Sequence, residues 1–228
     1  TVRKRISVIP QEARVIPWLT PKQTITSYLM YRGLSISEAK RRAEENLKRL
    51  GIESYANKLN RVLSGGLKRK VLVATVISSE ADILFLDEPT TGLDPISRNE
   101  LWEILNEIKK ERFIFLTTHY LEEAERLADN LAILEKGELA GMGTMDDLRS
   151  KFSRKYSIRI LDNTFISFDY GEMVKGYDNK IQILADEREA EIITRELIDK
   201  KIKFSYNPIS LEDIFYYLVK KPIEEEDV

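Results

Sequence analysis

The stretch Asp82-Ile83-Leu84-Phe85-Leu86-Asp87-Glu88-Pro89 decides the fold class. Four apolar residues, followed by two carboxylates and a proline, indicate a buried strand that ends in a charged site. A strand that is apolar on both faces is typical of the middle of a parallel sheet covered on each side. Ligand sites in such sheets lie just beyond the carboxyl ends of the strands, which is where Asp87 and Glu88 fall. The eight residues alone also fit a strand that ends in a solvated acidic pair.

Composition narrows the classes of function. Charged residues make up 32% of the 228 residues, but the formal net charge is only −2. This balance argues against nucleic acid as a partner, because phosphate binding needs surplus positive charge. The absence of cysteine excludes disulfides and thiolate metal sites, and the single histidine, His119, leaves few routes to a zinc site. No apolar run reaches the roughly 20 residues that span a bilayer.

Upstream of the acidic strand, Ile6-Ser7-Val8-Ile9 predicts a short core strand that is followed by Gln11. Taken alone, Gln11 would be an ordinary loop amide just past a strand end. The sequence opens on Thr1, and residues 2–10 already lead into this strand. We therefore expect that further polypeptide precedes this segment.

Residues 22–80 predict a helical insertion between two pieces of the sheet domain, beginning with a short helix over residues 22–33. In the next helix, Ser35 and Glu38 have the spacing of a capping box, and Gly51 supplies the stop signal. Its expected buried stripe consists of Ala39, Ala43, Leu47 and Leu50.

The run Leu63-Ser64-Gly65-Gly66-Leu67 predicts the start of another helix. Ser64 is a good N-cap, and Gly65 and Gly66 leave the first amides uncovered. Free amides and the helix dipole favour an anion such as phosphate, and the adjacent Lys68-Arg69-Lys70 adds positive potential. A Ser-Gly-Gly turn is by itself more often only a turn, but its place shortly before Asp87 favours the anion site.

Two further polar residues follow the acidic strand. Asp94 is expected to cap a helix that begins at Pro95. The segment Arg112 to His119 predicts another core strand, which ends at the histidine. Because neighbouring parallel strands end at the same edge of a sheet, His119 should face the edge that carries Glu88.

The remainder of the chain predicts a short helix over residues 121–128, a hairpin that turns at Lys136-Gly137, and then a second module over residues 151–228. This module is expected to be a small α+β domain that ends in an acidic tail. Strands are predicted near residues 156–160, 165–168, 180–184 and 202–206, and helices begin near Asp186 and Pro208.

These motifs together resemble the nucleotide-binding domains of ABC (ATP-binding cassette) transporters, from about Arg3 to Leu148. Five motifs of the family match in order: Gln11 at the Q-loop, Leu63-Ser64-Gly65-Gly66 at the signature, Ile83 to Glu88 at Walker B, Asp94 at the D-loop and His119 at the switch histidine. The order and spacing of five motifs are far more specific than any one of them.

The resemblance implies an α/β fold of the P-loop NTPase type, with a mostly parallel sheet and a helical subdomain. It implies that Asp87 and Gln11 help to hold Mg²⁺, and that Glu88 polarises the attacking water as general base. His119 would contact the γ-phosphate of ATP. The signature residues Ser64, Gly65 and Gly66, with Asp94, would contact the nucleotide held by the other subunit of a head-to-tail pair.

The resemblance also implies partners and a location. Such domains pair with each other and drive transmembrane permease subunits from the cytoplasmic face of the cell membrane. The run Ser210-Leu211-Glu212-Asp213-Ile214-Phe215 resembles the extension of ABC-2-type exporter ATPases, a group that includes drug exporters. Leu67 departs from the glutamine that many members carry there, which puts the substrate class in doubt.

One departure is larger. The 228 residues contain no Gly-x-x-x-x-Gly-Lys-Ser/Thr phosphate loop, the Walker A motif. We therefore interpret residues 1–150 as the carboxyl-terminal part of an ATP-binding domain and expect this chain alone to be inactive as an ATPase. Two alternatives stay open: a non-catalytic half that binds or regulates, and an ABC ATPase outside transport. The second usually carries long insertions, for which the stretch between Gln11 and Ser64 is short.

Overall fold

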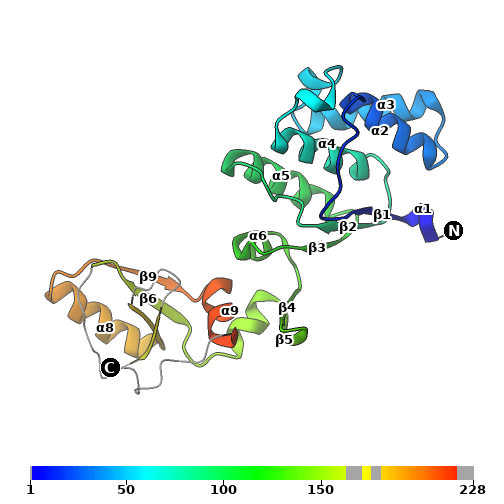
Figure 1. The fold of residues 1–228 in the computed structure, drawn as a ribbon. Helices are drawn as coiled ribbons and strands as arrows, with labels where there is room; N and C mark the ends of the chain where they lie inside the picture. The colour runs from blue at the N-terminus through cyan, green and yellow to red at the C-terminus, as the bar shows by residue number, and fades with distance from the viewer. Residues whose placement is uncertain (1, 163–170, 176–180, 220–228) are drawn as a thin grey trace. The chain divides into compact units, whose positions relative to one another are not determined.

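The computed structural model describes residues 2–162, 171–175 and 181–219. The chain forms two compact units, Thr1–Tyr120 and Leu121–Val228, and each unit contains both helices and strands (Figure 1). In the described part of the chain, no helix is long and apolar enough to cross a membrane.

A three-stranded parallel sheet runs through the first unit in the order β1-β2-β3. Its strands are β1 (Ile6–Ile9), β2 (Ile83–Asp87) and β3 (Phe113–Thr117). The acidic stretch therefore forms the middle strand of a parallel sheet, as predicted. Leu84 and Leu86 on one face of β2 are buried. Phe85 on the other face is half-buried and packs on Phe115, with 5.5 Å between ring centroids.

Two expectations about this sheet were wrong. β3 is not a core strand, because Phe113 and Phe115 are 63% and 51% exposed. The reason is its position, since β2 is its only strand partner in the described part of the sheet. Residues 2–5 do not lead into β1 as extended chain but form one helical turn, α1 (Val2–Arg5), so that the strand begins at Ile6.

Helices lie between β1 and β2, where the sequence predicts the helical insertion. They are α2 (Pro21–Tyr31), α3 (Ile36–Arg49), the 3₁₀ turns η1 (Glu53–Tyr55) and η2 (Asn60–Val62), and α4 (Gly65–Ile77). α2 packs on both α3 and α4, and α4 packs on β1. A further helix, α5 (Pro95–Ile108), connects β2 to β3.

The helix α3 begins and ends where its sequence predicts. Ser35 Oγ accepts a hydrogen bond from the Glu38 amide at 3.3 Å, and Gly51 has a φ of +66°, in the left-handed region. The expected capping box is only half formed, because the Glu38 carboxylate accepts hydrogen bonds from Arg41 and Arg42 instead of reaching back to the Ser35 amide. The predicted apolar stripe is buried: Ala39, Ala43, Leu47 and Leu50.

The second unit begins with α6 (Leu121–Leu127), the antiparallel hairpin of β4 (Leu131–Glu135) and β5 (Glu138–Gly143), and α7 (Met145–Ser150). The hairpin turns at Lys136 and Gly137, as predicted. Their φ values of 51° and 83° are the positive angles that a tight two-residue hairpin turn requires.

A four-stranded antiparallel sheet in the order β7-β8-β6-β9 forms the rest of this unit. Its elements are β6 (Tyr156–Ile160), β7 (Glu172–Lys175), β8 (Ile181–Ala185), α8 (Glu187–Asp199), β9 (Phe204–Pro208) and α9 (Leu211–Val219). β6 and both helices are confirmed, β8 and β9 begin slightly later than predicted, and β7 was not predicted. The strand predicted at 165–168 and the acidic tail lie outside the described residues.

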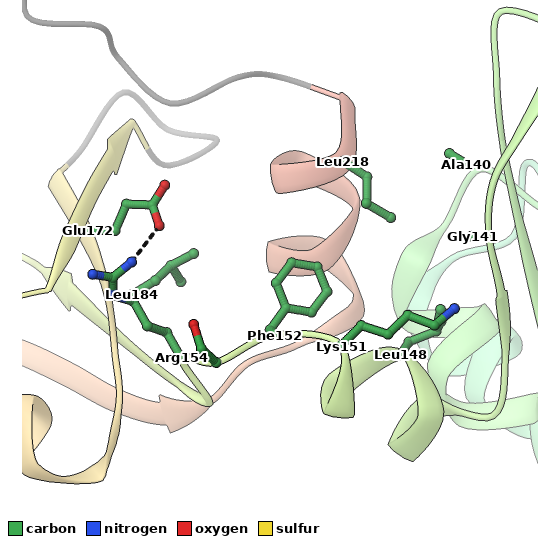
Figure 2. A pocket seen from close by; sticks show the side chains of 10 residues that line it. Ala140, Gly141, Leu148, Lys151, Phe152, Arg154, Glu172, Leu184 and Leu218 are labelled. Carbon is green, nitrogen blue, oxygen red and sulfur yellow. Dashed lines mark hydrogen bonds and ion pairs between the residues drawn. The ribbon is translucent and has the colours of Figure 1, made fainter.

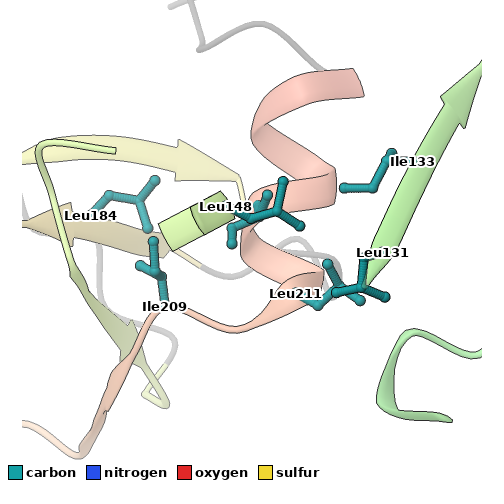
Figure 3. Close-up of a cluster of buried hydrophobic side chains, with 7 residues drawn as sticks. Leu131, Ile133, Leu148, Leu184, Ile209 and Leu211 are labelled. Carbon is teal, nitrogen blue, oxygen red and sulfur yellow. The ribbon is translucent and has the colours of Figure 1, made fainter. Parts of the chain in front are cut away.

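An apolar cluster joins the early and late parts of the second unit (Figure 3). Leu131 and Ile133 of the hairpin, Leu148 of α7, and Leu211 and Ile214 of α9 are buried in it. α9 accordingly packs on α6, α7 and β5. The domain boundary expected after residue 150 lies inside this compact unit and stays a prediction.

Candidate functional site

The carboxyl ends of the parallel strands meet at one edge of the first unit's sheet. Asp87, the last residue of β2, is aligned with Thr117, the last residue of β3. The Thr117 hydroxyl donates a hydrogen bond to Asp87 Oδ1, and the backbone amide of Gln11, just past β1, donates to Asp87 Oδ2 at 3.3 Å. The Asp87 carboxylate therefore links the ends of all three strands.

Glu88 follows in a backbone conformation that side-chain-bearing residues rarely adopt. Its φ is +48°, in the left-handed region, where such a residue is less stable by about 1 kcal/mol or more. Its amide donates to the Thr117 carbonyl at 3.0 Å, which fixes the start of this turn to β3. Strain of this kind persists only where surrounding contacts hold it, so the contacts of Glu88 define the site.

Three side chains surround the Glu88 carboxylate. Gln11 Nε2 and Thr91 Oγ1 each donate to Glu88 Oε2 at 3.1 Å. His119 Nδ1 lies 3.1 Å from Glu88 Oε1. The expectation that His119 faces the edge that carries Glu88 is confirmed, and Gln11 joins the same group, although their catalytic roles stay predictions.

These contacts decide the ionisation of the carboxyl group. The hydrogen bond with His119 lowers the pKa of Glu88 below its usual value, the bonds from Thr91 and Gln11 act in the same direction, and partial burial opposes them. Glu88 is therefore a carboxylate at neutral pH, with a side chain that is 21% exposed. It can accept a proton or orient a water without first being deprotonated.

The donor atoms beside Asp87 fit a magnesium ion. Mg²⁺ prefers oxygen ligands and takes one or two carboxylates, with waters and substrate phosphates completing its shell. Asp87 carries a carboxylate at this edge, and the side chain of Gln11, whose Nε2 donates to Glu88, carries an amide oxygen there. No cluster of three or more acidic or histidine side chains that could hold a metal by themselves occurs among the described residues.

The residues of the predicted anion site form a separate group. Ser64 caps α4, as predicted, and its Oγ accepts from the Leu67 amide at 3.3 Å. Within the described chain, no hydrogen bond or ion pair links Ser64, Gly65 or Gly66 to the Glu88 group. A Cβ added at Gly66 would lie only 3.3 Å from Leu93 Cδ2, so the helix start packs closely against the loop that leads to Asp94.

Asp94 caps α5, as predicted, with Pro95 as the first helical residue. Its Oδ1 accepts from the Ser97 amide at 3.0 Å, and this hydrogen bond lowers the pKa of Asp94. Asp94 and the glycines of α4 lie in adjacent segments, because Gly66 packs against Leu93. No hydrogen bond or ion pair in the described chain joins Asp94 to Glu88.

Sequence reasoning missed several residues of this edge. Arg69 and Lys70 were expected to add positive potential to the anion site, but they are only 8% and 7% exposed. Arg69 donates to backbone carbonyls at the strand ends, and Lys70 pairs with Glu100 at 2.7 Å. Their position at the start of an apolar helical run was the one signal of burial.

Tyr120 was missed as well. The centroids of the Tyr120 and His119 rings lie 4.1 Å apart, with the ring planes tilted by 40°. The Arg98 guanidinium of α5 lies 4.1 Å from the Tyr120 ring centroid, so Tyr120 contacts both residues. The sequence spacing does not predict the contact between Arg98 and Tyr120, because this contact depends on how α5 packs beside β3.

The second unit contains a cavity of about 230 Å³ (Figure 2). Its polar lining is already engaged: Arg154 pairs with Glu172 at 2.8 Å, and Lys151 Nζ donates to the Met142 carbonyl at 3.3 Å. Leu148, Leu184, Leu218 and Phe152 supply an apolar lining. None of the candidate site residues belongs to it.

Comparisons with known proteins cover both units. A sequence profile of the family described as ABC transporter matches residues 1–91. The daunorubicin/doxorubicin resistance ATP-binding protein DrrA of Streptomyces peucetius is 32% identical over an alignment that covers 99% of this chain and 73% of that protein. The phospholipid-transporting ATPase ABCA3 of Rattus norvegicus is 34% identical over 70% of this chain.

The chain spans only 9% of the length of that ABCA3 relative. A solved structure described as an ATP binding subunit of an ABC transporter has a similar fold, with a TM-score of 0.58 and 33% sequence identity. The aligned region covers 65% of this chain and 62% of the chain in that structure.

Proposed function

The chain belongs to the ATP-binding proteins of ABC transporters, and we propose that it works in an exporter of the ABC-2 type, where ATP hydrolysis at its sheet edge drives transport through membrane partners. The observation that carries this proposal is the group around Glu88: an ionised carboxylate at the end of a parallel strand, contacted by Gln11, Thr91 and His119. The match to DrrA supports the exporter subgroup, because it extends through the second unit.

Glu88 is the proposed general base. Phosphoryl transfer needs little covalent chemistry from the protein, so the main tasks are to orient the attacking water and to balance charge. The Glu88 carboxylate can accept the hydrogen bond of that water, and a positioned base contributes about 10²–10⁴-fold to the rate. Gln11 and Thr91 hold Oε2, which fixes the direction of the carboxylate.

His119 is proposed to contact the γ-phosphate. Its side chain is 54% exposed, and its Nδ1 is engaged with Glu88 Oε1. The ring can therefore present its other nitrogen to a ligand while Glu88 fixes its orientation. When bound, Mg²⁺ would supply a positive charge that neutralises the phosphates, and Asp87 with Gln11 is the pair proposed to hold it.

The signature residues Ser64, Gly65 and Gly66, with Asp94, are proposed to serve a second ATP-binding subunit. The first amides of α4 form an anion site at a helix N-terminus. In the described chain no hydrogen bond or ion pair joins these residues to the Glu88 side chain, which is consistent with a role toward a nucleotide held by the other subunit. The pair can be a homodimer or a heterodimer. We further propose that the protein binds transmembrane permease subunits at the cytoplasmic face of the membrane. It is proposed to have no nucleic-acid partner.

Residues 1–228 by themselves are proposed to hydrolyse no ATP. Most of the phosphate contact in such proteins comes from the amides and the lysine of the phosphate loop, and these 228 residues contain no such sequence. We expect Mg-ATP binding no tighter than about 1 mM, which corresponds to about −4 kcal/mol.

Calorimetry tests this proposal in two steps. The first titrates residues 1–228 with Mg-ATP, and the second titrates the same residues fused behind the phosphate-loop segment of a related ATP-binding protein. The fusion should bind ATP in the micromolar range and hydrolyse it, and a fusion whose loop lysine is replaced by alanine should do neither. A fusion that binds ATP without hydrolysing it would favour the non-catalytic, regulatory function instead.

A further inference from the structure

Arg69 connects three motifs of the proposed site: the loop of Gln11, the helix that begins at the signature, and the turn that holds Glu88. It sits in the second turn of α4, after the capping Ser64, and it is one of the few buried cations of the first unit. A buried guanidinium must place its N–H groups on acceptors, because leaving them unpaired away from water is unfavourable. Arg69 donates to backbone carbonyls at and just beyond the ends of β1 and β2.

Four carbonyls receive these hydrogen bonds. Arg69 Nη2 donates to the carbonyls of Asp87 and Glu88 at 2.6 and 2.5 Å, and Nε donates to the Pro89 carbonyl at 3.0 Å. Nη1 donates more weakly to the Gln11 carbonyl at 3.4 Å. A single planar side chain thus spans the turn after β2 and the loop after β1.

The turn that Arg69 contacts is the strained one. Glu88 has a φ of +48°, and the Thr91 amide closes the turn by donating to the Glu88 carbonyl at 3.3 Å. Arg69 binds the same carbonyl and those on either side of it. A cation placed over three successive carbonyls stabilises the backbone that holds them together, which is what a left-handed glutamate requires.

We propose that Arg69 is a positioning residue that holds Glu88 in its left-handed conformation and aligns its carboxylate with Gln11 and His119. Arg69 donates to the carbonyls of residues 87–89, so it acts through their backbone. Because it extends from the helix that Ser64 begins, it also ties the signature helix to the Glu88 turn. The inference rests on the proposed function for its catalytic meaning, but the geometry it asserts exists without nucleotide.

The single histidine of the chain gives a direct readout. Proton NMR of residues 1–228 should show the ring C–H signals of a single histidine, and these report the contact between His119 and Glu88. Arg69→Met should shift this signal, and amide hydrogen exchange at Thr91 and Leu93 should become at least about tenfold faster, since a hydrogen bond to a charged donor contributes more than a neutral one. Arg69→Lys keeps the charge but loses the planar fork, so it should give an intermediate shift.

The matched control is Lys70→Met. Lys70 is the next residue of α4 and is equally buried, but it pairs with Glu100 of α5 and not with the strand ends. Lys70→Met should leave the His119 signal and the exchange of Thr91 and Leu93 as in the original chain. An equal effect of Lys70→Met would overturn the proposal, because both variants would then act by loosening α4.

Fluorescence of Trp18 and Trp102, both in the first unit, shows whether each variant is folded. An unchanged His119 signal in folded Arg69→Met overturns the proposal. If Arg69→Met does not fold, Arg69→Lys decides: a shifted His119 signal supports the positioning role, and an unchanged one overturns it. Neither readout requires ATP, so a failure here is distinct from a failure of the proposed ATPase function.

Discussion

Each unit of the chain contains a polar network beside a sheet, and the two networks differ in where their hydrogen bonds lead. In the second unit, Gln182 Nε2 donates to Ser157 Oγ at 2.7 Å and to Asp213 Oδ1, and all three residues are at most 8% exposed. In the first unit, Glu88 accepts from side chains of several loops and remains partly exposed at an open strand end.

The difference indicates that the Asp213 network stabilises the fold, whereas the Glu88 contacts form a site. Asp213 also accepts from the Ser210 amide at 2.8 Å, so its carboxylate fixes α9 to β8 and has little capacity left for a ligand. Glu88 is held by contacts that orient it without covering it. A buried network that satisfies itself contributes to stability, whereas an oriented and partly exposed carboxylate on a strained turn indicates a site.

The largest expected effect is on the closed network. Asp213→Ala leaves the buried Gln182 amide with Ser157 Oγ as its remaining acceptor and removes contacts at the start of α9. We expect the free energy of unfolding of the second unit to fall by about 3 kcal/mol. Because both tryptophans lie in the first unit, circular dichroism should show the change in urea unfolding, while tryptophan fluorescence should not.

The control is Glu212→Ala, at the adjacent and more exposed position. Glu212 lies 4.0 Å from Arg159 with a side chain that is 41% exposed, so its loss should change stability by less than about 1 kcal/mol. An equal loss in both variants would mean that the Asp213 network is not what holds α9.

A smaller effect is expected at the cap of α9. Ser210 Oγ accepts from the Asp213 amide at 3.2 Å, and Ser210→Ala should lower the free energy of unfolding of the second unit by about 1 kcal/mol. The same circular dichroism measurement applies, with the exposed Ser153→Ala as the control. No change in Ser210→Ala would show that Asp213 fixes α9 without help from the cap.

The open network should respond to the loss of an aromatic neighbour. Tyr120→Ala removes the ring that packs against His119, an interaction that contributes about 0.5–1.5 kcal/mol. We expect the histidine NMR signal to move and broaden, with Tyr120→Phe as the control that retains the ring and the original signal. A shift in Tyr120→Phe equal to that in Tyr120→Ala would assign the effect to the hydroxyl instead.

The smallest effect lies on the solvated face of α3. Hydrogen bonds from Arg41 and Arg42 lower the pKa of Glu38 to about 2. Because the folded pKa is below the unfolded value, the stability that Glu38 contributes is present above about pH 4.5 and is lost as the pH falls toward 2.

Glu38→Gln should therefore flatten the acid side of the thermal stability curve of the first unit, as followed by tryptophan fluorescence. Glu53→Gln is the control, since Glu53 makes none of the ion pairs in the described chain. An acid side that is equally steep in Glu38→Gln and the original chain would contradict the assignment.

Much of the fold could be predicted from the sequence, because local signals decide it. Alternating and continuous apolar runs placed β2, α3, α5 and β6, and capping residues such as Ser64, Asp94 and Asp186 placed helix starts. The exposure of β3 could not be predicted, because it depends on which strands stand beside Phe113 and Phe115. β7 was missed because it is short and lacks a clear alternation.

The candidate site residues could be predicted from the sequence, but the residues that hold them in place could not. Gln11, Glu88 and His119 are polar residues at strand ends, and the parallel order of the sheet brings them together. Arg69, Thr91 and Tyr120 contact them through turns and helix packing. Sequence spacing does not encode those contacts, and a basic residue beside a glycine-rich turn reads as surface charge.

The central claim is that Glu88 is placed for chemistry and not for stability. The most direct measurement compares ATP hydrolysis, ATP binding and unfolding of the phosphate-loop fusion with those of its Glu88→Gln variant, with Glu103→Gln on the exposed face of α5 as the control. We predict that Glu88→Gln lowers turnover by about 10²-fold or more, retains ATP binding and unfolds at the same urea concentration. Turnover near that of the original fusion, with ATP still bound, would contradict the claim.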